Sequence, residues 1–294
     1  MSQTPWALIL TSVVAGCTNK PNGAAAAVDA GLFGAPSSAD AAAEGPAKST
    51  IRGAPPAVCP AGMNPLPGGT YAARRKFGEA PIAIVVSPFC LDVTEVTVEA
   101  YATCLHAKGC TDTKPDKEGV CNLGHPGSKN HPMNCVTWPQ ANAYCAWEGE
   151  RLPSEDEWEW AARGLDRDLA YPWGNDAPGP TLLNACDQEC IRWREAAFPG
   201  ELTSAAIYPQ SDGWPNTAPV GSFPKGRSPL GFLDLAGNVD EWTASDYGGL
   251  YKDNKAVRGG AWTGHDARRF GLKTDRHENG PNGEGWDIGF RCAK

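Results

Sequence analysis

Cysteine is the residue type that most constrains how this chain can fold. The sequence of 294 residues contains 11 cysteines, and ten of them lie after residue 58. These ten are Cys59, Cys90, Cys104, Cys110, Cys121, Cys135, Cys145, Cys186, Cys190 and Cys292. An even number of cysteines behind an export signal predicts disulfide bonds formed in an oxidising compartment. Zinc at Cys186 and Cys190 is the alternative, but no second compact pair of ligands accompanies them.

The N-terminus has the pattern of such an export signal. Its apolar run, residues 6–16, is too short to cross a bilayer as a helix but matches the hydrophobic segment of a signal peptide. The run ends in Val14, Ala15, Gly16 and Cys17, which resembles a bacterial lipobox. No Lys or Arg precedes it, so an ordinary apolar N-terminus is the alternative. We predict a lipoprotein signal peptide over residues 1–17, lipidation of Cys17, and attachment to the cell membrane or outer membrane, with the protein periplasmic or at the cell surface.

Composition separates two further regions. Residues 18–58 are dominated by Ala, Gly, Pro and Ser, and they cannot bury enough apolar surface to offset the entropy of ordering. They are predicted to be a disordered linker, and residues 59–294 to be the folded domain. The net charge of −8 would repel phosphate backbones, which excludes nucleic acid as a partner.

Three short helices are predicted in the first half of the domain. Each follows a residue whose hydroxyl can cap a helix, namely Thr97, Thr137 and Ser154, and the last two stand three residues before Gln140 and Glu157 in the spacing of a capping box. Gly109, Gly149 and Gly164 supply the stops.

The second half of the domain has a different composition. Loops rich in Gly, Pro, Asn and Trp separate brief runs that read as strands, such as residues 255–258 and 288–292. With 11 tryptophans in the chain and so few regular elements, we expect buried aromatic rings to provide much of the packing.

Four motifs stand out in the domain. They are Arg151-Leu152-Pro153 with Glu157-Trp158, the sequence Gly-Asn-Val-Asp-Glu-Trp at 237–242, Arg-Gly-Gly-Ala-Trp at 258–262, and Gly-Phe-Arg-Cys at 289–292. These motifs resemble those of the formylglycine-generating enzyme family, the sulfatase-modifying-factor domain. The resemblance covers essentially all of residues 59–294. It implies an α+β, C-type-lectin-like fold that is irregular and has little regular secondary structure.

The resemblance also implies a chemistry whose key residues are missing. In the family, two cysteines shortly after the Gly-Gly-Ser/Ala-Trp turn hold one Cu(I), a soft metal that thiolates stabilise. The matching positions here are about Gly264 and Arg269, and no cysteine lies between Cys190 and Cys292. Cys186 and Cys190 could substitute only if their loop folded into the cleft, which we do not expect. No copper is therefore expected.

The family pattern bears on the disulfides as well. In relatives, the cysteine that matches Cys145 pairs with the one in the terminal Gly-Phe-Arg-Cys motif, which implies a bond from Cys145 to Cys292. Proximity in sequence suggests the other four bonds. These are Cys104 to Cys110, Cys121 to Cys135, Cys186 to Cys190 and, from the remaining pair, Cys59 to Cys90.

Structural Ca²⁺ is the cofactor that the resemblance implies, because Ca²⁺ prefers several hard oxygen ligands and stiffens irregular loops. One site would use Asn238, the Val239 carbonyl and Glu241, although Asp240 stands where the family usually has tryptophan. Alternatively, Asn238 and Glu241 merely satisfy backbone groups in a turn. The second site would use Asn184, the Ala185 carbonyl, Asp212 and the Trp214 carbonyl.

Two further clusters of residues could form functional sites, but each also has a purely structural explanation. His265 and His277, with Asp266, Asp275 and Glu278, could bind a transition metal, but a solvated polar loop is the favoured interpretation. Four arginines could form an anion-binding floor or could equally be framework residues that pair with carboxylates. They are Arg268, Arg269, Arg276 and Arg291.

The sequence thus favours a cell-envelope lipoprotein whose domain is a binding or scaffold module without oxidase chemistry. Its cleft could hold a peptide, a glycan or a protein loop, and a lipid anchor would join it to the membrane. The alternative is a metal-dependent oxidase or modifying enzyme that works without the copper-binding cysteines. Fold alone does not separate these functions.

Overall fold

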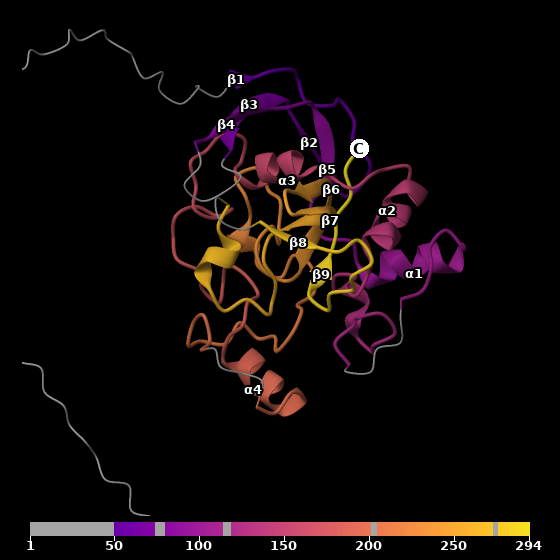
Figure 1. Cartoon of the computed structure of the whole chain (residues 1–294), viewed down its shortest axis with the longest axis vertical. Helices are drawn as coiled ribbons and strands as arrows, with labels where there is room; N and C mark the ends of the chain where they lie inside the picture. The colour runs from indigo at the N-terminus through magenta and orange to yellow at the C-terminus, as the bar shows by residue number, and fades with distance from the viewer. Residues whose placement is uncertain (1–49, 74–79, 114–118, 201–204, 273–275) are drawn as a thin grey trace, which may run out of the picture. The chain divides into compact units, whose positions relative to one another are not determined.

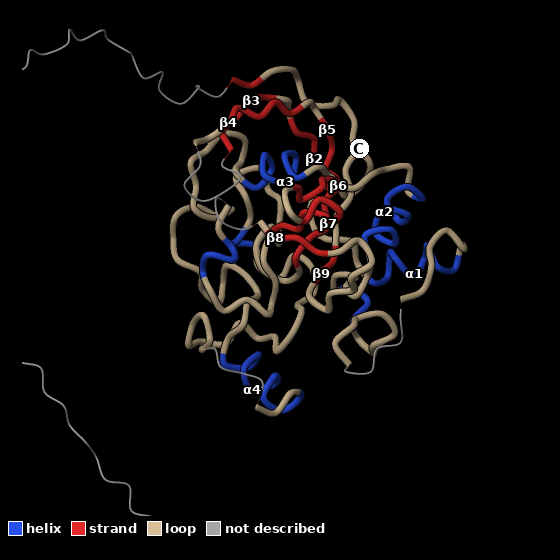
Figure 2. The backbone as a smooth tube through the Cα atoms, viewed as in Figure 1, coloured by secondary structure: helices blue, strands red, loops and turns tan. Residues whose placement is uncertain are grey.

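A four-stranded sheet formed by the second half of the chain lies near the centre of the domain (Figures 1 and 2). The computed structural model describes residues 50–73, 80–113, 119–200, 205–272 and 276–294. Cys17 and the lipobox lie outside these residues. Long loops connect the elements, as expected from the Gly-rich and Pro-rich sequence.

The central sheet has the order β8-β7-β6-β9. Strands β6 and β7 are antiparallel, whereas β9 is parallel to β6. Two smaller sheets, β1-β3-β4 and β2-β5, come from the beginning of the domain. The strands are β1 Thr50–Ile51, β2 Met63–Leu66, β3 Gly69–Ala73, β4 Ile82–Val86, β5 Phe89–Asp92, β6 Asp240–Gly248, β7 Tyr251–Arg258, β8 His277–Asn279 and β9 Ile288–Gly289.

The three predicted helices form where their caps place them. They are α1 Val98–His106, α2 Trp138–Trp147 and α3 Glu155–Ala162. The hydroxyls of Thr97, Thr137 and Ser154 accept the backbone N–H groups expected of N-caps. Both predicted capping boxes are complete, because the side chains of Gln140 and Glu157 bond back to the capping residues.

Three differences from the predicted elements stand out. Residues 50 and 51, assigned to the linker, pair with β3, since backbone pairing needs no large apolar side chain. The strand predicted over 288–292 is regular only at β9, and Ala293 then makes isolated bridges to Leu91 and Arg151. A fourth helix, α4 (Gln188–Ala197), was not predicted at all. The remaining elements are the 3-10 turns η1 Ser128–Asn130, η2 Pro224–Gly226 and η3 Ala267–Phe270.

Buried tryptophans supply much of the core, as the composition suggested. Trp158, Trp160, Trp242 and Trp262 are each almost completely buried. Three of them donate their indole N–H to buried acceptors: Trp160 to the Pro67 carbonyl, Trp242 to the Val136 carbonyl and Trp158 to the Glu241 carboxylate. These three rings therefore bury apolar area without leaving their N–H donors unpaired.

Five disulfides cross-link the domain, and they join the same pairs that were expected. The bonds are Cys59–Cys90, Cys104–Cys110, Cys121–Cys135, Cys145–Cys292 and Cys186–Cys190. The bond between Cys145 and Cys292 spans 147 residues and ties α2 to the C-terminal segment. Several disulfides fit a protein exported to an oxidising compartment. None of the described helices has both the length and the apolar character needed to cross a membrane.

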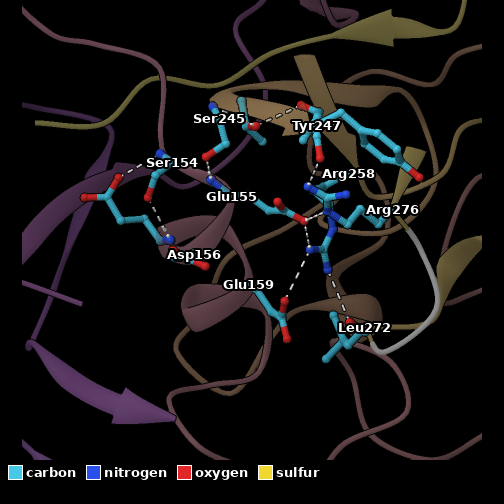
Figure 3. A network of polar contacts seen from close by, with 12 residues as sticks. Ser154, Glu155, Asp156, Glu159, Ser245, Tyr247, Arg258, Leu272 and Arg276 are labelled. Atoms are coloured by element: carbon cyan, nitrogen blue, oxygen red, sulfur yellow. Dashed lines mark hydrogen bonds and ion pairs between the residues drawn. The ribbon is translucent and has the colours of Figure 1, made fainter. Parts of the chain in front are cut away.

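A network of buried charges fixes α3 against the central sheet (Figure 3). Arg258, at the end of β7, contacts Glu155 at 3.0 Å and Glu159 at 3.2 Å, and all three side chains are buried. Arg276 contacts Glu155 at 2.6 Å and donates to the Tyr247 carbonyl. Arg276 is therefore a framework arginine and not part of an anion-binding floor.

Candidate functional site

The turn after β7 is the geometric centre of the candidate site. Gly259 and Gly260 both have positive φ angles, 113° and 70°. A Cβ on Gly260 would lie 2.5 Å from the Arg269 carbonyl, so only glycine fits there. The Gly260 N–H donates to Asp240 at 2.8 Å, and the Trp262 N–H donates to the Asn238 carbonyl at 2.9 Å. The start of β6 and the turn therefore hold each other in one conformation.

Positions 264 and 269, where the resemblance places catalytic cysteines, have other roles. Gly264 uses its carbonyl to accept the Cys186 N–H at 2.9 Å. The Arg269 guanidinium lies 3.2 Å from the buried carboxylate of Asp240, and His277 lies 3.3 Å from the other oxygen. Burial alone would raise the pKa of Asp240, but the hydrogen bond and charge of His277 and the charge of Arg269 outweigh it and lower that pKa.

A second carboxyl group lies beside this ion pair. The Thr263 hydroxyl donates to Asp287 at 2.9 Å, and the Asp240 N–H donates to the Asp287 carbonyl at 2.8 Å. Burial and the neighbouring Asp240 charge raise the pKa of Asp287. The part of the cleft that would hold soft thiolates in the family is therefore built from carboxylates, an arginine and a histidine.

The loop that carries Cys186 and Cys190 does lie against this turn, contrary to the expectation that it would stay away from the cleft. Both cysteines pack on Trp262, and the Cys186 N–H bonds to Gly264. The helix that follows, α4, is capped by Asp187, which accepts the N–H groups of Glu189 and Cys190. The two sulfurs are bonded to each other, so they do not replace the missing thiolate pair.

Helix α4 brings two aromatic rings over the turn. Trp193 packs edge-on against Trp262 at 5.3 Å between ring centres, and Phe198 packs against Trp286 at 5.1 Å. Trp262 and Trp286 are themselves 6.1 Å apart. These four side chains form one cluster, which we call the aromatic wall. Except for Trp262, its members are partly exposed.

The first predicted calcium site does not suit a cation. Both oxygens of Glu241 accept hydrogen bonds from Arg291, at 2.6 and 2.7 Å, and one also accepts from Trp158. The Asn238 side-chain oxygen accepts the Ala218 N–H at 2.9 Å. Glu241 is thus the counter-ion of a buried arginine. The alternative in which these residues satisfy backbone groups describes Asn238 but not Glu241, whose acceptors are used by side chains.

The second predicted calcium site has a free oxygen. Asn184 is almost completely buried, and its side-chain oxygen has no hydrogen-bond partner among the described residues. The Asp212 carboxylate accepts the N–H groups of Ala185 and Trp214 and the hydroxyl of Tyr208. Burial raises the pKa of Asp212 to about 6. An orphaned amide oxygen and a partly buried carboxylate are groups that a hard cation would satisfy.

The remaining candidate residues do not assemble a second centre. Arg268 pairs with Asp266 and Arg291 with Glu241, so all four arginines are framework residues that pair with carboxylates. Asp275 lies outside the described residues. Within the described part of the chain, only Asp92, Glu150 and Cys292 bring three potential ligands together, and Cys292 is in a disulfide.

Comparison with known proteins identifies the family to which the domain belongs. Residues 53–294 match the model of the sulfatase-modifying factor enzyme 1-like domain. The chain belongs to this family. The match begins at residue 53, whereas the predicted domain boundary is residue 59. The predicted α+β fold of this family is confirmed by the match and by PvdO from Pseudomonas aeruginosa, which has a TM-score of 0.59 at 24% identity over 79% of this chain and 93% of that one.

Curated relatives include active and inactive enzymes. The chain is 31% identical to the formylglycine-generating enzyme of Streptomyces coelicolor, over 88% of this chain and 95% of that protein. It is 38% identical to the inactive C-alpha-formylglycine-generating enzyme 2 of Bos taurus, over 55% of this chain and 50% of that protein. The chain thus spans about half the length of the latter relative.

Two parts of the site were not predicted from the sequence, namely the aromatic wall and the ion pair of Asp240 with Arg269. The aromatic wall depends on α4, whose start is marked by Asp187 and by a run of helix-forming residues up to Ala197. Cys186 and Cys190 indicated only a local disulfide, which forms here together with the helix that contains Cys190. The pairing of Asp240 with Arg269 carries no local signal, because the two residues are 29 positions apart.

Proposed function

We propose that this protein is an exported, non-catalytic binding module of the sulfatase-modifying factor family. The observation that carries the proposal is the ion pair between Arg269, at a position where the family has a catalytic cysteine, and Asp240, where it usually has tryptophan. All ten cysteines after residue 58 are bonded in pairs, so none offers a thiolate to copper. The similarity to the inactive relative in Bos taurus also supports a non-catalytic role.

The aromatic wall supports a binding role for the cleft. Exposed edges of Trp193, Phe198 and Trp286 offer apolar contact, and the indole N–H of Trp262 has no acceptor among the described residues. Large aromatic side chains with a polar tip are favoured at binding surfaces because they contribute large contact areas. We propose a peptide or protein loop as the ligand of this cleft, and a glycan is the competing ligand.

We predict that the protein does not convert cysteine to formylglycine. Full-length protein incubated with Cu(I) and a peptide carrying the Cys-x-Pro-x-Arg motif should yield no aldehyde by mass spectrometry, because no described thiolate pair is present to hold the metal. The Streptomyces coelicolor enzyme serves as the positive control. Aldehyde formation at a rate comparable to that control would contradict the proposal and favour a metal-dependent modifying enzyme.

We also propose that Ca²⁺ binds at Asn184 and Asp212, with the carbonyls of Ala185 and Trp214 as further ligands. The unpartnered Asn184 oxygen and the partly buried carboxylate of Asp212 support this site over the one at Asn238 and Glu241. Ca²⁺ would supply positive charge that keeps Asp212 ionised, and it would tie the segment before α4 to the loop around residue 212.

Chelation should therefore destabilise the protein. A ligand that binds only the folded state adds about 2.7 kcal/mol when its concentration is one hundred times Kd. Adding a calcium chelator should lower Tm, and Asn184→Ala should abolish that effect, whereas Asn238→Ala should retain it. Since the pKa of Asp212 without metal is about 6, calcium affinity should fall as pH drops below about 6. Identical melting curves with and without chelator would refute the site.

Membrane attachment is a further proposal, supported by the lipobox and by the disulfide content. We propose that Cys17 is lipidated and anchors the protein to the membrane. In the natural host, Cys17→Ser should release the protein from the membrane fraction or block its maturation. Mass spectrometry that finds an unmodified Cys17 in the mature protein would rule the anchor out.

A further inference from the structure

A basic pocket shares no residue with the aromatic wall or with the turn at Gly259 and Gly260. Its volume is about 610 Å³, which falls within the range of small-molecule sites, roughly 300 to 1,000 Å³. Arg167, just after α3, forms one part of its lining, and Lys225 and Arg227 at η2 form another. Trp173, Ser228 and the turn 229–231 complete it.

The charges of this pocket are unusual for the molecule. The chain has a net charge of −8, yet the lining contains three cations and no carboxylate. Elsewhere in the domain arginines pair with carboxylates, as Arg258, Arg276 and Arg291 do. Arg167, Lys225 and Arg227 make no ion pair with any described residue. Three unpaired cations around one hollow favour an anionic ligand.

Other groups in the lining narrow the class of ligand. Ser228 is 1% exposed, and its hydroxyl has no hydrogen-bond partner among the described residues. The ring of Trp173 stacks on Tyr171 at 4.9 Å, and its N–H donates to the Asp176 carbonyl. Trp173 is thus fixed in place where it lines the pocket. Cations suit a phosphate group, and an indole suits a ring attached to it.

The backbone around the pocket is also held firmly. The Ser228 N–H donates to the Phe232 carbonyl at 2.8 Å, and the Gly231 N–H donates to the Ser228 carbonyl at 2.9 Å. Phe232 is completely buried and anchors this turn in the core. Gly164, with φ of 59°, lets the end of α3 approach Pro229 closely. A site with a fixed lining loses little conformational entropy when a ligand binds.

We propose that the basic pocket binds a phosphate ester carried on a ring, namely a sugar phosphate or a nucleoside monophosphate. The phosphate would contact Arg167, Lys225 and Arg227, and the ring would lie against Trp173. This binding is independent of the cleft, of the missing copper chemistry and of the calcium site. It gives the module a second ligand, distinct in class from the peptide proposed for the cleft.

Titration calorimetry on the full chain tests this site with four probes. Glucose 6-phosphate and uridine monophosphate represent the two sources of the ring, and glucose and inorganic phosphate are the controls that lack one half of the ligand. We expect at least one ring phosphate to bind roughly tenfold or more tightly than either control. The tighter of the two identifies the ring. No detectable binding of either ring phosphate, or binding no tighter than inorganic phosphate, would overturn the proposal.

Variants locate the binding in the pocket. Arg227→Gln and Lys225→Gln remove exposed cations without touching the core, and each should weaken ring-phosphate binding by roughly tenfold or more. Trp173→Leu should weaken the ring phosphates more than inorganic phosphate. Lys252→Gln removes an exposed lysine of β7 that does not line the pocket, and it should leave binding unchanged. Equal losses in Lys252→Gln and Arg227→Gln would indicate a nonspecific charge effect and overturn the proposal.

Discussion

Replacing Arg291 with methionine should lower the free energy of unfolding by about 3 to 5 kcal/mol, because the change leaves the Glu241 carboxylate buried without its counter-ion. Both side chains are completely buried, and their closest contact is 2.6 Å. The same guanidinium also donates to the carbonyls of Asp92, Val93 and Leu233. Arg291 therefore satisfies buried acceptors from three segments at once.

A matched control separates burial from charge. Arg151 forms an equally short pair with Glu157 at 2.7 Å, but the Arg151 side chain is 47% exposed. Arg151→Gln should cost about 1 kcal/mol or less. Adding Glu241→Gln to Arg291→Met should recover part of the lost stability, because the buried charge of Glu241 is then removed together with its counter-ion. Urea unfolding followed by tryptophan fluorescence measures all four proteins, and similar losses for Arg291→Met and Arg151→Gln would contradict this account.

Removal of the bond between Cys145 and Cys292 is expected to have a comparable effect. In the chain-entropy model, a cross-link that closes a loop of this length contributes up to about 5 kcal/mol, and the two cysteines here are 147 residues apart. The double variant Cys145→Ala with Cys292→Ala should therefore unfold at a much lower urea concentration than the unmodified protein. Both cysteines are buried, so the lost packing adds to the effect.

The bond between Cys104 and Cys110 provides the control. It closes a separation of only 6 residues, for which the same model gives about 2 kcal/mol. Cys104 is also buried, so a comparable packing loss accompanies its removal. The double variant Cys104→Ala with Cys110→Ala should be clearly less destabilised. Equal losses for the two double variants would show that loop length does not determine the contribution of the long-range bond.

Local chemistry made part of this fold predictable. The caps at Thr137 and Ser154 involve residues three positions apart, so the sequence alone contains both partners. The strand at residues 50–51 left no such trace, because its partner β3 begins 18 residues later and its pairing uses backbone atoms only. Propensity reports what a segment can do by itself, whereas short strands depend on what lies beside them.

The candidate site divides in the same way. The absence of cysteine at positions 264 and 269 could be read directly from the sequence. The pairing of Asn184 with Asp212 in one calcium site could be predicted only through the family resemblance. The role of Glu241 could not, since its partner Arg291 lies 50 residues further along the chain. A motif shows which chemical groups are present. The fold determines whether a carboxylate binds a metal ion from the solvent or pairs with an arginine of the protein.

The position of the C-terminal segment limits when the domain can complete its folding during synthesis. Residue 294 exchanges two backbone hydrogen bonds with Cys90, and Arg151 exchanges two with Ala293. Strand β9 completes one side of the central sheet. The contacts of Cys90 and Arg151 with residues 293 and 294 join positions about 140 to 200 apart, so they cannot form while the end of the domain is still inside the ribosome. The two disulfide-bearing segments around Cys90 and Cys145 therefore stay without these partners until the last residues of the domain have emerged.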